Sequence, residues 1–155
     1  MPHVMIVEDD ISLGAAVTMR LELMGYLVSV VRDGTDAVRR ISDEAPDLVV
    51  LDVAIPGMNG LDVAETIRRD RISNCDIIIH TGTDCEETDL RALLFGCTLL
   101  KKEPGSLFTL QRLIEERLGC YHESRVRTRR RSSGDLASLK WSKQDSAFEK
   151  SAAQV

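Results

Sequence analysis

The sequence predicts an α/β protein with a parallel β-sheet that is covered by helices on both faces. Short runs of strand-forming apolar residues alternate with segments whose apolar residues recur at helical spacing, which gives five β-α units. Three of the runs, VMIV, LVVL and IIIH, are almost continuously apolar, as in strands buried on both faces. The length of 155 residues and the apolar share of 43% suit one domain with appendages.

The expected strands follow one another along most of the chain. They are His3–Val7, Leu27–Val31, Leu48–Asp52, Ile77–His80 and Leu99–Lys102. Helical spacing is clearest in two of the intervening segments, at Ile11, Ala15, Thr18, Leu21 and Leu23, and at Leu61, Ala64 and Ile67. Ligands of such sheets bind beyond the carboxyl ends of the strands, so the site is expected among the residues that end each strand.

Charge is unevenly distributed along the chain. Residues 1–119 hold 12 Lys+Arg against 21 Asp+Glu, a net charge of -9, whereas residues 120–155 hold 8 against 4, a net charge of +4. Large apolar residues also become scarce after Gly119. We therefore expect a domain at 1–119 and a basic, flexible tail at 120–155. The run RVRTRRR at 125–131 suits a solvated segment, an arm for a partner or for nucleic-acid phosphates, or a remnant of a longer protein.

Several classes of protein are excluded by what the sequence lacks. No basic segment with a long apolar stretch begins the chain, and no run of apolar residues is long enough to span a bilayer, so we expect a cytoplasmic protein with no membrane partner. The four cysteines form no C-x-x-C pair, which argues against a zinc site or a disulfide framework. A P-loop is also missing.

Acidic residues gather where the strands end. The first strand ends in VEDD, the third in LD and the fourth in HTG, which places Glu8, Asp9, Asp52 and Thr81 at one edge of the sheet. Three neighbouring carboxylates repel one another unless a divalent cation joins them, and an oxygen-only cluster favours Mg²⁺. Glu8 and Asp9 could instead be first-turn acids that favour the helix dipole, and Asp10 suits the N-cap of the next helix.

A carboxylate beside Mg²⁺ can act as a nucleophile and hold a phosphoryl group, and Asp52 is the candidate. Such a transfer needs a hydroxyl and an ammonium near the phosphoryl oxygens, and Thr81 and either Lys101 or Lys102 could supply them. A multiple-turnover phosphatase would carry a general acid two residues after the nucleophile, where this chain has Ala54. We therefore expect a protein that is not an enzyme in the ordinary sense and that loses the group slowly.

Four motifs, each at a strand end, give the chain a family resemblance. They are IVEDD at Ile6–Asp10, LDVAIPGMNG at Leu51–Gly60, IHTG at Ile79–Gly82 and GCTLLKKEP at Gly96–Pro104. With these motifs, residues 3–118 resemble the receiver domain of two-component response regulators. The resemblance implies a flavodoxin-like, doubly wound sheet of strand order 2-1-3-4-5.

The resemblance also implies a function. Asp52 would be the phosphoacceptor, Glu8, Asp9 and Asp52 would hold Mg²⁺, and the backbone carbonyl of Val53 would be a further ligand. The phosphoryl group would come from a histidine kinase or a histidine phosphotransfer protein, and the output would be a changed contact with a downstream protein target. We expect no sequence-specific DNA binding, because about 36 tail residues offer no output domain. The alternative is a degenerate receiver that binds partners without being phosphorylated.

The chain departs from the family pattern at its fifth strand. Receivers usually end that strand with an aromatic residue, two further residues, a lysine and a proline, whereas this chain reads LLKKEP at 99–104. Counting back from the proline would put Glu103 against the phosphoryl group, an unfavourable contact between like charges. Treating Glu103 as an extra residue instead places Lys102 inward, Lys101 outward and Leu99 at the aromatic position.

Overall fold

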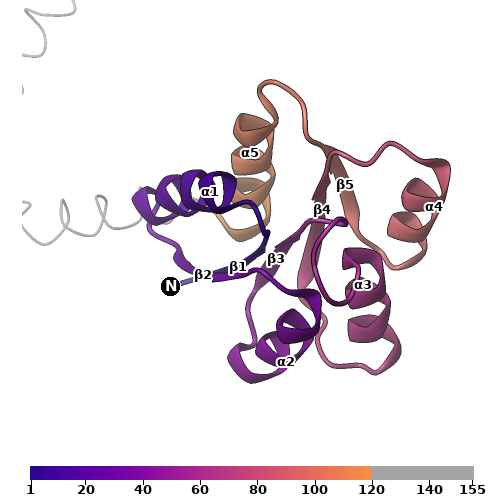
Figure 1. Cartoon of the computed structure of the whole chain (residues 1–155). Coiled ribbons are helices and arrows are strands. Elements are labelled where there is room, and N and C mark those ends of the chain that lie inside the picture. Colours follow the sequence, from indigo (N-terminus) through magenta and orange to yellow (C-terminus); the bar gives the residue numbers. More distant parts are fainter. Residues whose placement is uncertain (120–155) are drawn as a thin grey trace, which may run out of the picture. The chain divides into compact units, whose positions relative to one another are not determined.

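The structure, a computed structural model, describes residues 1–119. The predicted tail at 120–155, with its basic run, lies outside the described residues and is drawn in grey in Figure 1.

Strands and helices alternate throughout the described residues. The strands are β1 (His3–Val7), β2 (Leu27–Val31), β3 (Leu48–Leu51), β4 (Asp76–Thr81) and β5 (Thr98–Lys101). The helices are α1 (Ile11–Leu23), α2 (Gly34–Glu44), α3 (Gly60–Arg69), α4 (Glu86–Leu94) and α5 (Ser106–Leu118). All pairings are parallel and the strand order is β2-β1-β3-β4-β5, so the predicted fold class is confirmed. The first two strands have the predicted bounds, and the other three differ by one residue at one or both ends.

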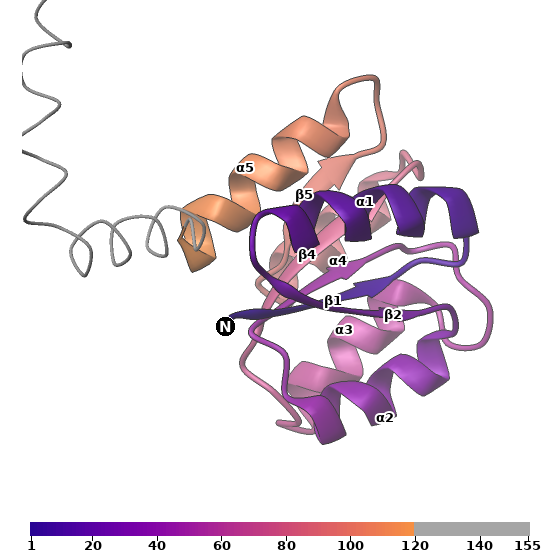
Figure 2. The ribbon, with the colours of Figure 1, turned by 90° about the vertical axis from the view of Figure 1, so that its left-hand side faces the viewer.

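The sheet is the middle of three layers. Helices α1 and α5 cover one face, and α2, α3 and α4 cover the other (Figures 1 and 2). Alternate residues of a strand serve the two sides, as the pleat requires. In β1, for example, Met5 packs in the core beneath α2, α3 and α4, whereas Ile6 packs in the core beneath α1 and α5. This explains why the central strands have no polar face.

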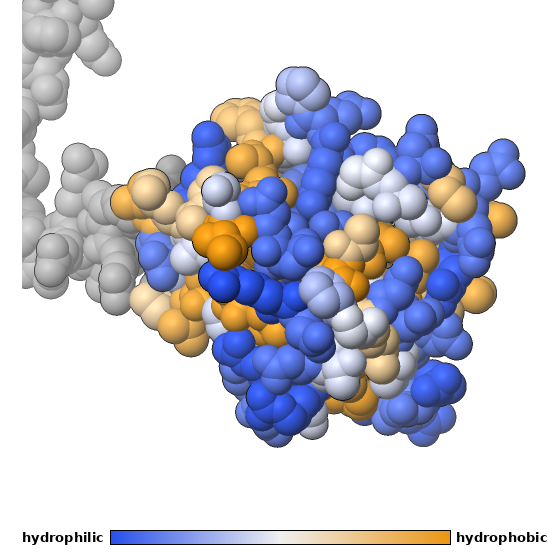
Figure 3. Space-filling view, in the orientation of Figure 1, coloured by the Kyte–Doolittle hydropathy of each residue, from blue (hydrophilic) through white to orange (hydrophobic). Residues whose placement is uncertain are grey.

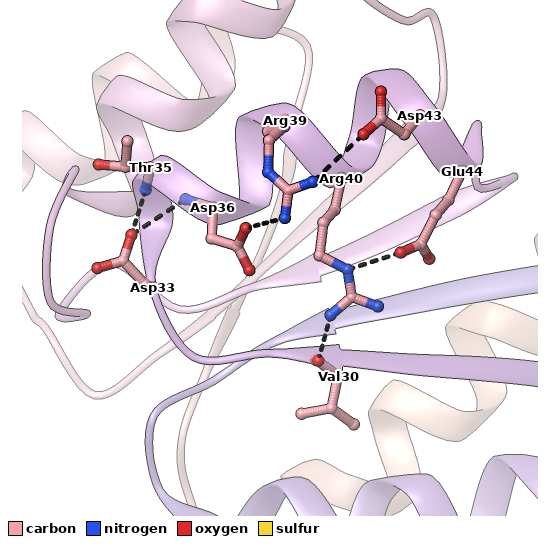
Figure 4. Close-up of polar contacts among 8 residues, drawn as sticks. All are labelled: Val30, Asp33, Thr35, Asp36, Arg39, Arg40, Asp43 and Glu44. Carbon is pink, nitrogen blue, oxygen red and sulfur yellow. Dashed lines mark hydrogen bonds and ion pairs between the residues drawn. The ribbon is translucent and has the colours of Figure 1, made fainter.

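Helix α2 lies beside the edge strand β2 and carries a dense set of polar contacts (Figure 4). The Asp33 carboxylate accepts hydrogen bonds from two amides of the first turn and so caps the helix. Near its other end, Arg40 pairs with Glu44 at 2.6 Å and donates to the carbonyl oxygen of Val30 at 2.8 Å. Arg40 thereby ties the helix to the exposed edge of the sheet.

Hydrophilic residues cover much of the face shown in Figure 3, and hydrophobic residues form separate groups among them. Several large apolar side chains are exposed on α4, namely Leu90, Leu93 and Leu94. None of the helices formed by residues 1–119 combines the length and the apolar character that a bilayer crossing requires.

Candidate functional site

The strand ends bring the predicted site residues to one edge of the sheet. Val7 and Leu51 are partners in the register of β1 and β3, so the residues that follow them, Glu8 and Asp52, lie side by side. The Asp52 amide donates to the Val7 carbonyl at 3.0 Å, which fixes this arrangement. Thr81, the last residue of β4, ends the next strand of the sheet and is fully buried.

Glu8, Asp9 and Asp52 form a group that could hold a metal ion. One carboxylate oxygen from each residue lies within 4.8 Å of the other two. Glu8 and Asp52 are only 5% and 6% exposed, whereas Asp9 is exposed. Three oxygen ligands with one side open to solvent fit Mg²⁺, which keeps several waters and binds through few carboxylates.

Lys102 supplies the positive charge of this cluster. Its Nζ donates to Glu8 Oε2 and to Asp52 Oδ2, each at 2.7 Å. Burial raises the pKa of Glu8, although the hydrogen bond from Lys102 opposes that rise. Burial alone would lower the pKa of Lys102, but its hydrogen bonds to Asp52 and Glu8 outweigh burial and the net shift is upward. The lysine is therefore charged, and it pairs with two of the three carboxylates.

The two adjacent lysines point to different places. Lys101 is the last residue of β5 and its ammonium contacts the β4-α4 loop and α4, while Lys102 follows the strand and faces the carboxylates. The Lys102 amide donates to the Thr81 carbonyl at 2.8 Å, which extends the pairing of β4 and β5. Glu103 is exposed. In the structure, therefore, Lys102 and not Lys101 or Glu103 faces the carboxylates.

Two neighbouring groups orient the side chains of the site. The Ala54 amide donates to Asp52 Oδ1 at 3.3 Å, and the Thr83 amide donates to Thr81 Oγ1 at 3.1 Å. Because Thr81 Oγ1 accepts that bond, its own hydroxyl hydrogen can be donated elsewhere. The backbone donor at Ala54 could not be identified from the sequence, because any residue type provides an amide.

The turn after Asp52 needs its glycine because the backbone passes very close to the site. A Cβ at Gly60 would lie 2.0 Å from the Asp52 carbonyl oxygen, so only glycine lets α3 begin there. Asn59 caps α3 by accepting a hydrogen bond from the Leu61 amide. The Val53 carbonyl, the fourth predicted metal ligand, already accepts hydrogen bonds from the amides of Ile55 and Gly60, which would compete with a metal ion.

The remaining polar residues near the cluster have structural partners. The Asp10 carboxylate accepts a hydrogen bond from the Leu13 amide, so the expected N-cap of α1 is confirmed. The Asp10 amide donates to Glu8 Oε1. His80 is buried beside Thr81 and its Nε2 lies 3.1 Å from Ser106 Oγ. Burial, together with the charge of Lys102, lowers the pKa of His80 to about 4, so the ring is neutral.

A family model and curated relatives both place the chain in one protein family. The response regulator receiver domain model matches residues 4–106. The chain is 42% identical over 80 residues to the DNA-binding response regulator MtrA of Mycobacterium tuberculosis, an alignment that covers 52% of this chain and 34% of that protein. It is 36% identical over 69 residues to the transcriptional regulatory protein AfsQ1 of Streptomyces coelicolor, covering 44% of this chain and 31% of AfsQ1. The chain thus spans about a third of the length of these curated relatives.

Solved structures agree with this result. The receiver domain of the Francisella response regulator 1452 matches with a TM-score of 0.67 at 26% identity, over 80% of this chain and 99% of that one. The chemotaxis protein CheY4 of Vibrio cholerae matches with a TM-score of 0.63 at 29% identity, over 72% of this chain and 98% of that one.

Proposed function

The chain belongs to the response regulator receiver domain family, and we propose that it is a phosphorylation switch that accepts a phosphoryl group on Asp52. The observation that carries the proposal is the cluster of three carboxylates at the end of the sheet, two of which pair with Lys102. The phosphoryl group would come from a histidine kinase or a histidine phosphotransfer protein. Loss of the group by hydrolysis would be slow, because Ala54 provides no general acid.

The transfer is a displacement at phosphorus. An oxygen of the Asp52 carboxylate forms the new P–O bond, and the P–N bond to the donor histidine breaks, with its electron pair left on the imidazole. Lys102, which already contacts Asp52 at 2.7 Å, would pair with a phosphoryl oxygen. The Thr81 hydroxyl would donate to another oxygen.

Glu8, Asp9 and Asp52 would hold Mg²⁺, with the Val53 carbonyl as a further ligand if its bonds to the amides of Ile55 and Gly60 are released. The ion would draw the anionic donor close and neutralise charge on the phosphoryl group. The dianion left on Asp52 would then hold Thr81 and Lys102 in new positions and shift the balance between two conformations, which a downstream protein would read.

Labelling with acetyl phosphate tests the proposal. Intact-mass spectrometry should show one added phosphoryl group when Mg²⁺ is present, and none in excess chelator. Asp52→Asn should abolish the addition. Asp10→Asn is the matched control, because Asp10 lies next to the cluster and caps α1, and asparagine caps a helix equally well. Labelling that survives in Asp52→Asn would disprove the assignment, and a chain that takes no label would support the degenerate receiver that binds partners unphosphorylated.

A further inference from the structure

Lys101 makes three contacts that the proposed function leaves unused. Its Nζ donates to the Thr83 carbonyl at 2.9 Å and to Asp89 Oδ1 at 3.1 Å, and lies 3.3 Å from Asp84 Oδ1. Thr83 and Asp84 belong to the loop between β4 and α4, and Asp89 lies in the first half of α4. One ammonium group therefore holds the end of β5, that loop and the helix together. We call these contacts the Lys101 clamp.

The clamp is connected to the phosphoacceptor site through the backbone. Lys101 is the register partner of Thr81, and the next residue, Lys102, donates its amide to the Thr81 carbonyl. The loop residue that Lys101 holds by its carbonyl, Thr83, donates its amide to Thr81 Oγ1 at 3.1 Å. A movement of the Thr81 hydroxyl or of the Lys102 side chain therefore acts on peptide groups directly beside the clamp.

Helix α4 depends on such tethers more than its neighbour does. Only Thr88 and Ala92 of α4 are buried, whereas α3 buries five residues, and the N-cap Cys85 makes no side-chain cap. The apolar contribution to docking is correspondingly small. Arg91 is another polar tether of the helix: it pairs with Asp62 and Glu65 of α3 and not with the residues of the site.

We propose that Lys101 is the positioning residue that couples the state of Asp52 to α4. In the arrangement seen here the clamp holds the β4-α4 loop and the start of the helix in place. When Thr81 and Lys102 turn toward a phosphoryl group, the peptide groups on either side of Lys101 move, and the ammonium carries that movement to Asp89. This inference rests on the proposed function, and it identifies the route by which the exposed side of α4 changes.

The test compares Lys101→Met, which keeps the length of the side chain without its charge, with Lys101→Arg. Lys101→Met should take up the phosphoryl group to the wild-type extent. Amide exchange of residues 83–94 in its unmodified form should rise on the order of tenfold, since bonds to a charged donor are lost. The chemical-shift changes that phosphorylation causes in α4 should fall below about half of the wild-type changes. Lys101→Arg, which keeps the charge, should show amide exchange and chemical-shift changes close to those of wild type.

Arg91→Met is the control for loosening alone. It should raise amide exchange in α4 but keep the response of α4 to phosphorylation, because Arg91 has no contact with the site. Wild-type responses of α4 in Lys101→Met would overturn the coupling. If the wild-type chain takes no phosphoryl group, the proposed function fails. Amide exchange in the unmodified Lys101→Met variant then tests only whether the clamp holds α4 in place. Unchanged exchange would overturn the clamp, and raised exchange would support it.

Discussion

The carboxylate cluster and the polar face of α2 both contain short ion pairs and an excess of acidic over basic side chains, but only the cluster has buried acids. Lys102 contacts its two carboxylates at 2.7 Å, and Arg40 contacts Glu44 at 2.6 Å. On α2 two arginines face three acids, none of which is buried, and each acid drawn in Figure 4 has an arginine or amide partner. In the site, one lysine serves two buried carboxylates and Asp9 stands beside them.

The difference in burial separates the two clusters electrostatically. Water screens the charges on α2, because none of its acids is buried, so the excess acid there needs no further cation. Buried carboxylates that exceed their cations carry an electrostatic cost, which a bound cation relieves. The burial of the excess acid, and not the presence of short ion pairs, is therefore what distinguishes the carboxylate cluster as a group that could hold a metal ion.

The largest effect should come from filling the space beside Asp52. In Gly60→Ala the new Cβ would lie 2.0 Å from the Asp52 carbonyl oxygen, so the backbone of the site must shift. We expect the free energy of unfolding to fall by about 3 kcal/mol or more, at the upper end of overpacking costs, and labelling to be lost with it. Denaturant unfolding measures the first effect and mass spectrometry the second.

Gly82→Ala is the matched control. Gly82 lies next to Thr81, but a Cβ there meets no atom within 4 Å. The free energy of unfolding of Gly82→Ala should stay within about 0.5 kcal/mol of the wild-type value. Equal losses in the two variants would mean that the close approach at Gly60 is not what constrains the site.

A smaller effect should appear as a pH dependence at His80, whose pKa is influenced by both kinds of charge in the site. Burial and the nearby charge of Lys102 lower its pKa to about 4, while Asp52 acts in the opposite direction. In the unfolded state His80 is therefore protonated below about pH 6.5, whereas in the folded state it is protonated only below about pH 4. Stability from this group is complete above pH 6.5 and is lost as the pH falls towards 4. The loss is on the order of 2–3 kcal/mol.

His80→Gln isolates this contribution, because glutamine can keep a hydrogen bond to Ser106 but does not titrate. Urea unfolding at several pH values between 7 and 4 should show a flatter profile for the variant than for wild type. Parallel profiles would show that His80 titrates normally, and hence that the acids of the cluster offset both burial and Lys102.

The sequence predicted the elements better than it predicted their polar contacts. Apolar runs placed every strand to within a residue, because burial on both faces of a parallel sheet leaves a continuous signal in the chain. The edge that gathers Glu8, Asp9 and Asp52 followed from strand ends and topology. The occupied Val53 carbonyl and the contacts of Lys101 could not be foreseen, since they depend on backbone amides and on a loop whose path leaves no pattern in the sequence.

The smallest effect should distinguish the two arginines of α2, which differ in burial rather than in charge. The Arg40 side chain is 27% exposed and also binds the Val30 carbonyl, whereas Arg39 is 66% exposed and pairs only with acids of its own helix. Arg40→Ala should therefore cost about 1 kcal/mol of unfolding free energy, and Arg39→Ala clearly less. Urea unfolding of both variants at pH 7 measures the difference.

Lowering the pH sharpens this last comparison. Burial would raise the pKa of Glu44, but the hydrogen bonds from Arg40 and Ser29 outweigh burial and the net shift is downward. A carboxyl with a lowered pKa adds stability above its unfolded pKa of 4.5 and loses it as the pH falls through the lower, folded value. The gap between Arg40→Ala and wild type should therefore narrow below about pH 4.5, down to what the bond to Val30 contributes. If the stability difference between Arg40→Ala and wild type is independent of pH, the whole effect comes from the bond to Val30 and not from the pair with Glu44. Equal losses of stability in Arg40→Ala and Arg39→Ala would contradict the role of burial.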